Sequence, residues 1–279
     1  MKKRKIEDAL RDGELLMRTC GWVLCKNVLN RDEVRVLRKE CDVLASQLDG
    51  DDLDDRGCVL DAMEKVPVTE ACRADAFEYC NIRKDATNMN AGELTVLFRI
   101  LFETLPNELL KVVRSEELFL FNEHYVCKPS RSSAEFSWHR DGEIQLAMVY
   151  AMGSKYAKNI YYSCWVALDD VSGENGALHF PGDGGDRSEA GDVVVSAEAG
   201  DVVVFSSHTL HRSGPNTTDC PRRAFYAQYS TKPIVRPRGG RSEVLSYAIA
   251  CNSEQSKRRR AASAGVLRPV KKGDCPKEE

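Results

Sequence analysis

Residues 200–230 read GDVVVFSSHTLHRSGPNTTDCPRRAFYAQYS, and this stretch decides the class of fold. It contains two short runs rich in β-branched and aromatic residues, at 201–206 and 224–230, with Gly, Pro, Asn and Asp between them. Runs of this kind are typical of strands, and the residues that separate them are typical of turns. The stretch therefore predicts two strands joined by a loop.

Similar runs fill the chain from Leu118 onward, again with turn residues between them. Their spacing predicts an all-β sandwich or barrel, and we assign residues 115–250 to this core. The expected strands are 118–127, 144–152, 160–168, 177–180, 192–195, 201–206 and 224–230.

The first 114 residues have a different periodicity, with apolar residues three and four apart, which indicates helices. The expected elements are helices over 5–20, 31–49 and 90–111 and a short strand with a turn over 21–29. We expect Pro106 to break the third helix in two, because proline has no N–H for the helical hydrogen bond. Residues 1–114 are assigned to a helical region that packs on the core.

Composition and charge fit an ordinary globular protein. The 279 residues include 40 basic and 43 acidic side chains, so the net charge of −3 gives no support for nucleic-acid binding. The 11 cysteines form no Cys-x-x-Cys pair, as in a reducing compartment. The sequence shows no signal-peptide pattern and no run of 18 apolar residues. We therefore predict a soluble intracellular protein, cytoplasmic or nuclear, with no membrane partner.

Both ends of the chain carry basic clusters, at 2–5 and 257–260. They could serve nuclear import or nucleic-acid binding, with solvated termini as the alternative that we favour. Residues 251–279 hold too few large apolar residues to fold alone and are assigned to a basic, disordered tail. The acidic stretch 49–55 is expected to form a solvated loop.

A His-x-Asp motif at His139 and Asp141 follows a predicted strand. Side chains two apart in an extended segment point to the same side, so both can bind one metal ion. His208 and His211, after the strand 201–206, can supply a second imidazole. Two imidazoles and one carboxylate form the facial triad of non-haem iron(II) oxygenases, whereas zinc normally has a fourth protein ligand or tetrahedral closure. The motif therefore predicts an iron site.

Arg222 lies eleven residues after His211, at the start of the next strand. An oxygenase that chelates 2-oxoglutarate at its metal needs a cation for the distal carboxylate, and the guanidinium fork suits a carboxylate. This spacing favours His211 as the third metal ligand, with His208 as the alternative. Arg223 stays open as an alternative to Arg222, because adjacent strand residues point to opposite faces.

These residues together resemble the phytanoyl-CoA dioxygenase family of 2-oxoglutarate oxygenases. The resemblance covers about residues 115–232 and depends on an ordered set of motifs. They are KP at 128–129, WHRD at 138–141, CWVALDD at 164–170, ENGAL at 174–178, PG at 181–182 and HRSGPN at 211–216.

The resemblance implies an α+β, mainly β fold: a double-stranded β-helix, that is, a cupin-like jelly roll, with the N-terminal helices packed on one sheet. It implies that His139, Asp141 and His211 bind Fe(II), and that Ser213 and Arg222 bind 2-oxoglutarate. Trp165 matches a tryptophan of the co-substrate pocket, with core packing as the alternative. His124 matches a further pocket position only weakly.

The implied activity is a dioxygenase that uses 2-oxoglutarate and dioxygen to hydroxylate a small molecule or an acyl thioester, releasing succinate and CO2. Ascorbate is the candidate reductant. Because related iron halogenases replace the carboxylate ligand by a small residue, Asp141 favours hydroxylation over halogenation. Two other functions stay open: an oxygenase acting on a protein or nucleic acid, suggested by the basic ends, and a non-catalytic jelly-roll binding protein.

The chain departs from the family pattern in two places. Pro181-Gly182-Asp183 stands where the family has Pro-Gly-Ser-His, which motivates the non-catalytic alternative. The segment between Asp141 and Trp165 is longer than in the family and is expected to add a lid.

Overall fold

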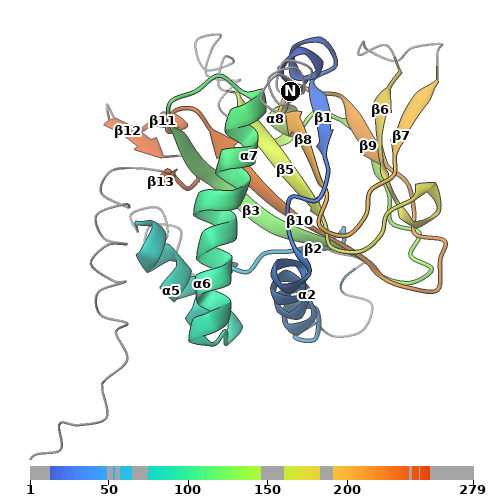
Figure 1. Cartoon of the computed structure of the whole chain (residues 1–279), viewed down its shortest axis with the longest axis horizontal. Helices are drawn as coiled ribbons and strands as arrows, with labels where there is room; N and C mark the ends of the chain where they lie inside the picture. Colours follow the sequence, from blue (N-terminus) through green and yellow to red (C-terminus); the bar gives the residue numbers. More distant parts are fainter. Residues whose placement is uncertain are drawn as a thin grey trace, which may run out of the picture.

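The computed structural model describes residues 13–48, 53, 57–64, 75–145, 160–182, 191–238, 241–244 and 246–251. Five expectations lie wholly or largely outside these residues: the start of the first helix at 5–12, the acidic loop, the strand residues 146–152, the lid between Asp141 and Trp165, and the tail after 251. Within the described part of the chain, two antiparallel sheets face each other, and helices cover the outer face of the larger sheet (Figure 1).

The larger sheet has the strand order β1-β8-β5-β10-β3-β13, and β2 also pairs with β3. Its strands are β1 (Trp22–Cys25), β2 (Val59–Leu60), β3 (Leu118–Lys128), β5 (Tyr161–Ala167), β8 (Val202–Ser206), β10 (Arg222–Ser230) and β13 (Ile249–Cys251). Two of these strands, β1 and β2, come from the segment assigned to the helical region, so that segment also extends the sheet.

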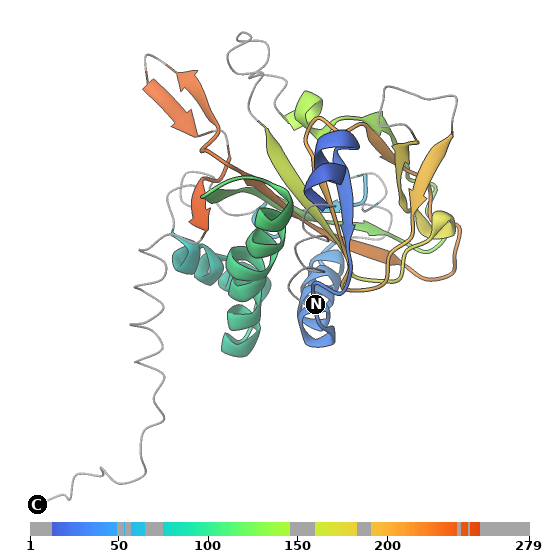
Figure 2. The same ribbon diagram turned by 45° about the horizontal axis from the view of Figure 1, so that its top comes forward.

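The smaller sheet has the order β4-β9-β6-β7 and lies opposite the helices (Figure 2). Its strands are β4 (Phe136–His139), β6 (Leu178–Pro181), β7 (Asp192–Val195) and β9 (His211–Ser213). A separate ribbon pairs β11 (Val235–Arg238) with β12 (Arg241–Val244). Two facing antiparallel sheets with helices on one side confirm the expected jelly roll.

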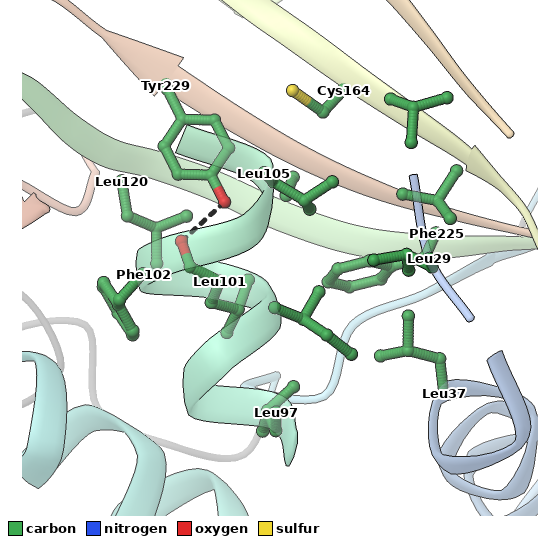
Figure 3. Close-up of a cluster of buried hydrophobic side chains, with 14 of the residues drawn as sticks. Leu29, Leu37, Leu97, Leu101, Phe102, Leu105, Leu120, Cys164, Phe225 and Tyr229 are labelled. Carbon is green, nitrogen blue, oxygen red and sulfur yellow. Dashed lines mark hydrogen bonds between the residues drawn. The ribbon is translucent and has the colours of Figure 1, made fainter. Parts of the chain in front are cut away.

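Buried apolar side chains form two clusters, one on each side of the larger sheet. The first fills the space between that sheet and the helices and includes Leu37, Leu101 and Phe225 (Figure 3). The second lies between the two sheets and includes Trp165 and Phe180. Within the described residues, every helix is too short or too polar to cross a lipid bilayer.

The helices in chain order are α2 (Arg31–Ala45), α5 (Ala76–Thr87), α6 (Ala91–Arg99) and α7 (Leu105–Val112), and residues 13–19 are also helical. A capping box starts α2: the Asn30 side chain accepts hydrogen bonds from the Asp32 and Glu33 N–H groups, and the Glu33 carboxylate accepts one from the Asn30 N–H. Such reciprocal bonds fix where a helix begins.

The expected break at Pro106 is wrong, because α6 and α7 are joined by a π-helical turn, Ile100–Thr104, and not by an interruption. The Leu105 N–H donates to the Ile100 carbonyl, five residues back. In that pattern the N–H of residue 106 would bond to the Leu101 carbonyl, but proline has none. The Tyr229 hydroxyl donates to the Leu101 carbonyl instead, at 2.7 Å (Figure 3).

Replacing Tyr229 with phenylalanine should lower the free energy of unfolding by about 1–3 kcal/mol, since a buried carbonyl then loses its donor. Urea denaturation of metal-free protein checks this. Tyr162→Phe is the matched control, because the Tyr162 hydroxyl on β5 makes no hydrogen bond seen among the described residues. Equal losses in the two variants would contradict the role given to the Tyr229 hydroxyl.

The expected strand at 144–152 is wrong at its start, because residues 141–145 form a short helix, α8 (Asp141–Gln145). Acidic residues in a first helical turn are favourable, and Asp141 and Glu143 are both there. The Gly142 N–H donates to the Ser207 carbonyl, which turns the chain toward the larger sheet.

Helix α5 was not expected from the sequence, because its buried side is partly charged and not a plain apolar stripe. Arg83 on this helix donates to both carboxylate oxygens of Glu40, at 2.9 and 2.6 Å, and one guanidinium nitrogen lies 2.6 Å from the Glu123 carboxylate. All three side chains are fully buried. The group ties α5 and α2 to β3, and such a buried charge is tolerated only when paired.

Candidate metal and co-substrate site

Two facing strands of the smaller sheet bring His139 and His211 together. They are direct partners in the pairing of β4 with β9, and their ring centroids are 4.3 Å apart. Asp141 follows at the start of α8, with its Oδ1 atom 3.5 Å from the Nε2 atom of each ring. One ligand atom from each of the three residues lies within 4.8 Å of the other two.

Both rings are held in one tautomer by backbone carbonyls. His139 Nδ1 lies 2.7 Å from the Ser137 carbonyl, and His211 Nδ1 lies 3.0 Å from the Thr209 carbonyl. Because a carbonyl only accepts, each Nδ1 carries the proton in the neutral ring and each Nε2 keeps a lone pair. This arrangement is usual for metal-binding histidines.

Besides the closeness of their ligand atoms, a second observation indicates that the three residues could bind a cation. Among the described residues, the buried His211 Nε2 atom has no hydrogen-bond partner. Two Nε2 lone pairs and one carboxylate oxygen therefore face one another with no donor between them, which is costly unless a cation or a proton intervenes. The donor set, two imidazoles and one carboxylate, suits iron(II).

Burial and the contacts among the three residues shift the pKa values of these side chains. Burial opposes ionisation of Asp141, but His211 and His139 outweigh burial and lower the pKa of the carboxyl group. Burial lowers the pKa of His211. At His139, burial works in the same direction, but the Asp141 carboxylate and the Ser137 carbonyl favour the protonated ring, outweigh burial and raise the pKa.

A pocket of about 360 Å³ opens beside the three residues. Its wall comes from both sheets and from the residues after β2. The lining residues are Val59, Asp61, Asn122, Glu123, His124, Val126, Phe136, His139, Asp141, Gln145, Trp165, Leu178, His211, Arg212, Ser213, Arg222, Tyr226 and Gln228.

Arg222 lies in this pocket and is only 1% exposed. Its guanidinium donates to the carbonyls of Asn175 (3.2 Å) and Gly176 (3.0 Å) and lies 5.5 Å from the centre of the Trp165 ring. Burial lowers the pKa of Arg222 to about 10, so the group stays charged at neutral pH. No carboxylate among the described residues pairs with it, which leaves a buried cation available to an anion.

Arg223 points to the opposite face of β10. Its guanidinium pairs with Asp169 at 2.8 Å and with Asp42 at 2.8 Å, on the helix side of the sheet. Among the described residues, the pocket therefore receives Arg222 and not Arg223 from this strand.

Ser213 also lines the pocket, and a buried lysine contacts it. The Lys128 ammonium donates to Ser213 Oγ at 3.0 Å and also to the Gly214 carbonyl. Gly176, in the left-handed region with φ +85°, packs close to both cations: a Cβ atom there would lie 2.8 Å from the Gly214 carbonyl and 3.3 Å from the Arg222 guanidinium. Only glycine suits both this φ and this space.

The other two histidines of interest lie in different places. His208 is exposed and outside the pocket wall, and its carbonyl accepts a hydrogen bond from Arg140. His124 lines the pocket and stacks on Tyr226, with ring centroids 4.8 Å apart. Burial lowers the pKa of His124 to about 4.

The low pKa of His124 predicts a loss of stability in acid. Below pH 6.5 the unfolded chain binds a proton at this residue that the folded protein does not bind until about pH 4. The free energy of unfolding should therefore fall by up to about 3 kcal/mol between these pH values. His124→Phe keeps a ring on Tyr226 and should remove this part of the loss in urea titrations across the range. An unchanged pH dependence in the variant would contradict the assignment.

The sequence reasoning missed two residues that contact Asp141. Ser163 Oγ donates to Asp141 Oδ2 at 2.9 Å, and the Gln228 side-chain amide lies 3.3 Å from the same oxygen. Both are fully buried on central strands of the larger sheet. A polar residue inside an otherwise apolar strand is the signal that points to such positions.

Comparisons with known proteins show which family the chain belongs to. The model of the family described as Phytanoyl-CoA dioxygenase (PhyH) matches residues 17–224. No curated protein sequence matches the chain.

Solved structures show a similar fold at low sequence identity. The epimerase SnoN from nogalamycin biosynthesis, described as non-heme and alpha-ketoglutarate dependent, is 18% identical over 89% of this chain and 98% of its own, with a TM-score of 0.57. The non-heme monooxygenase ThoJ is 21% identical over 91% of this chain and 95% of its own, with a TM-score of 0.54. AviO1 from Streptomyces viridochromogenes Tue57 is 21% identical over 81% of this chain and 96% of its own, with a TM-score of 0.53. With the family match over most of its length, the chain belongs to the phytanoyl-CoA dioxygenase family.

Proposed function

We propose that this protein is an Fe(II)- and 2-oxoglutarate-dependent dioxygenase that hydroxylates a small organic substrate or an acyl thioester. One observation carries the proposal: three metal-ligand atoms face one another beside a buried arginine that has no carboxylate partner among the described residues. SnoN, which has a similar fold, has been solved in complex with Fe3+ and alpha ketoglutarate.

In this proposal His139, Asp141 and His211 hold the iron. The iron, when bound, would be chelated by 2-oxoglutarate and would supply the chemistry for dioxygen-dependent hydroxylation, with succinate and CO2 as co-products. The two imidazoles keep their Nδ1 protons on backbone carbonyls, so they stay neutral ligands. The carboxylate of Asp141 offsets one of the two metal charges.

Arg222 and Ser213 bind the distal carboxylate of 2-oxoglutarate in this proposal. The guanidinium is already held by the Asn175 and Gly176 carbonyls, so little conformational entropy is lost on binding. Trp165 lies beneath the guanidinium and excludes water from that end of the pocket. An ion pair formed in such an enclosed place is stronger than one in water.

The remaining pocket wall is assigned to the organic substrate. It carries Asp61, Asn122, His124 and Gln145, and these side chains would orient the substrate at the metal. Polar groups held in fixed positions can orient a substrate for one reaction outcome.

The experiment combines a binding test with a turnover test. Anaerobic protein with Fe(II) and 2-oxoglutarate should develop a charge-transfer absorption band, and admitting oxygen with ascorbate should give slow succinate formation. A metabolite panel that includes acyl thioesters, followed by succinate release, then identifies the substrate. Protein that binds the metal but forms no succinate with any compound would count against an oxygenase and for a binding protein.

A further inference from the structure

Three polar side chains lie side by side on three adjacent strands and end at Asp141; Gln228 and Ser163 are fully buried, and Asn122 is half-buried. In the strand pairing, Gln228 of β10 lies opposite Asn122 of β3 on one side and Ser163 of β5 on the other. The Asn122 amide donates to Gln228 Oε1 at 3.2 Å. The Gln228 amide donates to Ser163 Oγ at 3.0 Å and approaches Asp141 Oδ2 at 3.3 Å. This set is called the polar chain below.

The direction of every hydrogen bond in the polar chain follows from Asp141. An ionised carboxylate only accepts, so Gln228 must present its NH2 group to it and keep its carbonyl for another donor. Asn122 supplies that donor with its own NH2 group. The Asn122 carbonyl oxygen is then left on the pocket wall, with no hydrogen bond seen to any described residue.

The backbone beside the polar chain is irregular. The pairing of β10 with β3 shifts register between Gln228 and Tyr229, which leaves Phe121 as an extra residue directly before Asn122. A bulge bends a strand and re-aims the neighbouring side chain, and bulges are frequent beside active sites. Here it lies where the wall of the pocket meets the polar chain.

We propose that Asn122, Gln228 and Ser163 are positioning residues that hold Asp141 Oδ2, so that Oδ1 faces His139 and His211, and that they link the pocket wall to the metal ligand. The proposal rests on the metal site of the proposed function. Holding one carboxylate oxygen favours a single-oxygen ligand over a chelating one and leaves the remaining metal positions for co-substrate and dioxygen.

The first test measures Co2+ binding by calorimetry and by the visible absorption of the bound ion, with no turnover required. Ser163→Ala and Gln228→Met should each weaken Co2+ binding about 10–100-fold and change the absorption spectrum, as expected for residues that orient a ligand. Ser230→Ala is the matched control. Its hydroxyl is also buried at 1% exposure on β10 but has no hydrogen-bond partner among the described residues.

The second test asks whether Asn122 acts through Gln228. Asn122→Ala should weaken Co2+ binding about threefold in the wild-type background and have no further effect in the Gln228→Met background. An independent, merely structural effect would give the same factor in both backgrounds and would overturn the linkage. Thermal unfolding of the metal-free variants identifies any that do not fold. If Gln228→Met does not fold, the first test is decided by Ser163→Ala, which is the smallest change.

The two proposals fail in different ways. Wild-type protein that binds no Co2+ would overturn the proposed function. Wild-type protein that binds Co2+ while Ser163→Ala and Gln228→Met keep wild-type affinity and spectrum would overturn the polar chain alone. Weaker binding and an altered spectrum in both variants, with Ser230→Ala unchanged, support it.

Discussion

Replacing Arg222 with methionine should raise the dissociation constant for 2-oxoglutarate at least about 100-fold. In the proposed site the guanidinium is the buried cation that meets the distal carboxylate, and charge-assisted hydrogen bonds of this kind contribute about 3 kcal/mol. Methionine fills a similar volume but offers no donor. The free energy of unfolding of the metal-free protein should change little, because removing a buried cation without a carboxylate partner offsets the loss of the donors to the Asn175 and Gly176 carbonyls.

Arg223→Met is the matched control, since it makes the same change one residue further along β10. Its guanidinium pairs with Asp169 and Asp42 on the other face of the sheet, so its loss should leave 2-oxoglutarate binding unchanged. Calorimetric titration of anaerobic, Fe(II)-loaded protein with 2-oxoglutarate measures both variants. If Arg223→Met weakened binding and Arg222→Met did not, the co-substrate assignment would be wrong.

Replacing Asp141 with alanine should abolish metal binding and, with it, the formation of succinate from 2-oxoglutarate. The carboxylate is the only anionic member of the triad. Its loss leaves two imidazoles, with ring centroids 4.3 Å apart, and no negative charge to offset a divalent ion. The affinity should fall by more than about 100-fold, beyond the effect typical of residues that only orient a ligand.

Metal content after gel filtration and Co2+ titration together measure this loss. Asp42→Ala is the control, because Asp42 is a carboxylate on α2 that pairs with Arg223, outside the pocket. Asp141→Ala protein that still binds one equivalent of Co2+ tightly would mean that the triad is not the metal site.

The strands of the core were largely predictable from local sequence, because a half-buried strand repeats every two residues and turn residues mark its ends. Expected runs at 118–127, 160–168 and 201–206 match β3, β5 and β8 closely. The α5 helix was missed because its inward side carries Arg83, whose burial depends on carboxylates 43 and 40 residues away in sequence, Glu40 and Glu123. The continuous helix through Pro106 was missed because its replacement donor, Tyr229, comes from a distant strand.

The sequence by itself determined which residue types are available for a metal and a co-substrate. His139, Asp141, His211 and Arg222 were named from motif and spacing, since those constraints are local to short segments. Tertiary structure decided which of two adjacent arginines enters the pocket, because strand register sets the face and register depends on the partner strands. It also decided that Ser163 and Gln228 reach Asp141. They lie 22 and 87 residues from it in sequence, and the pairing of β5 with β10 brings them to one carboxylate oxygen.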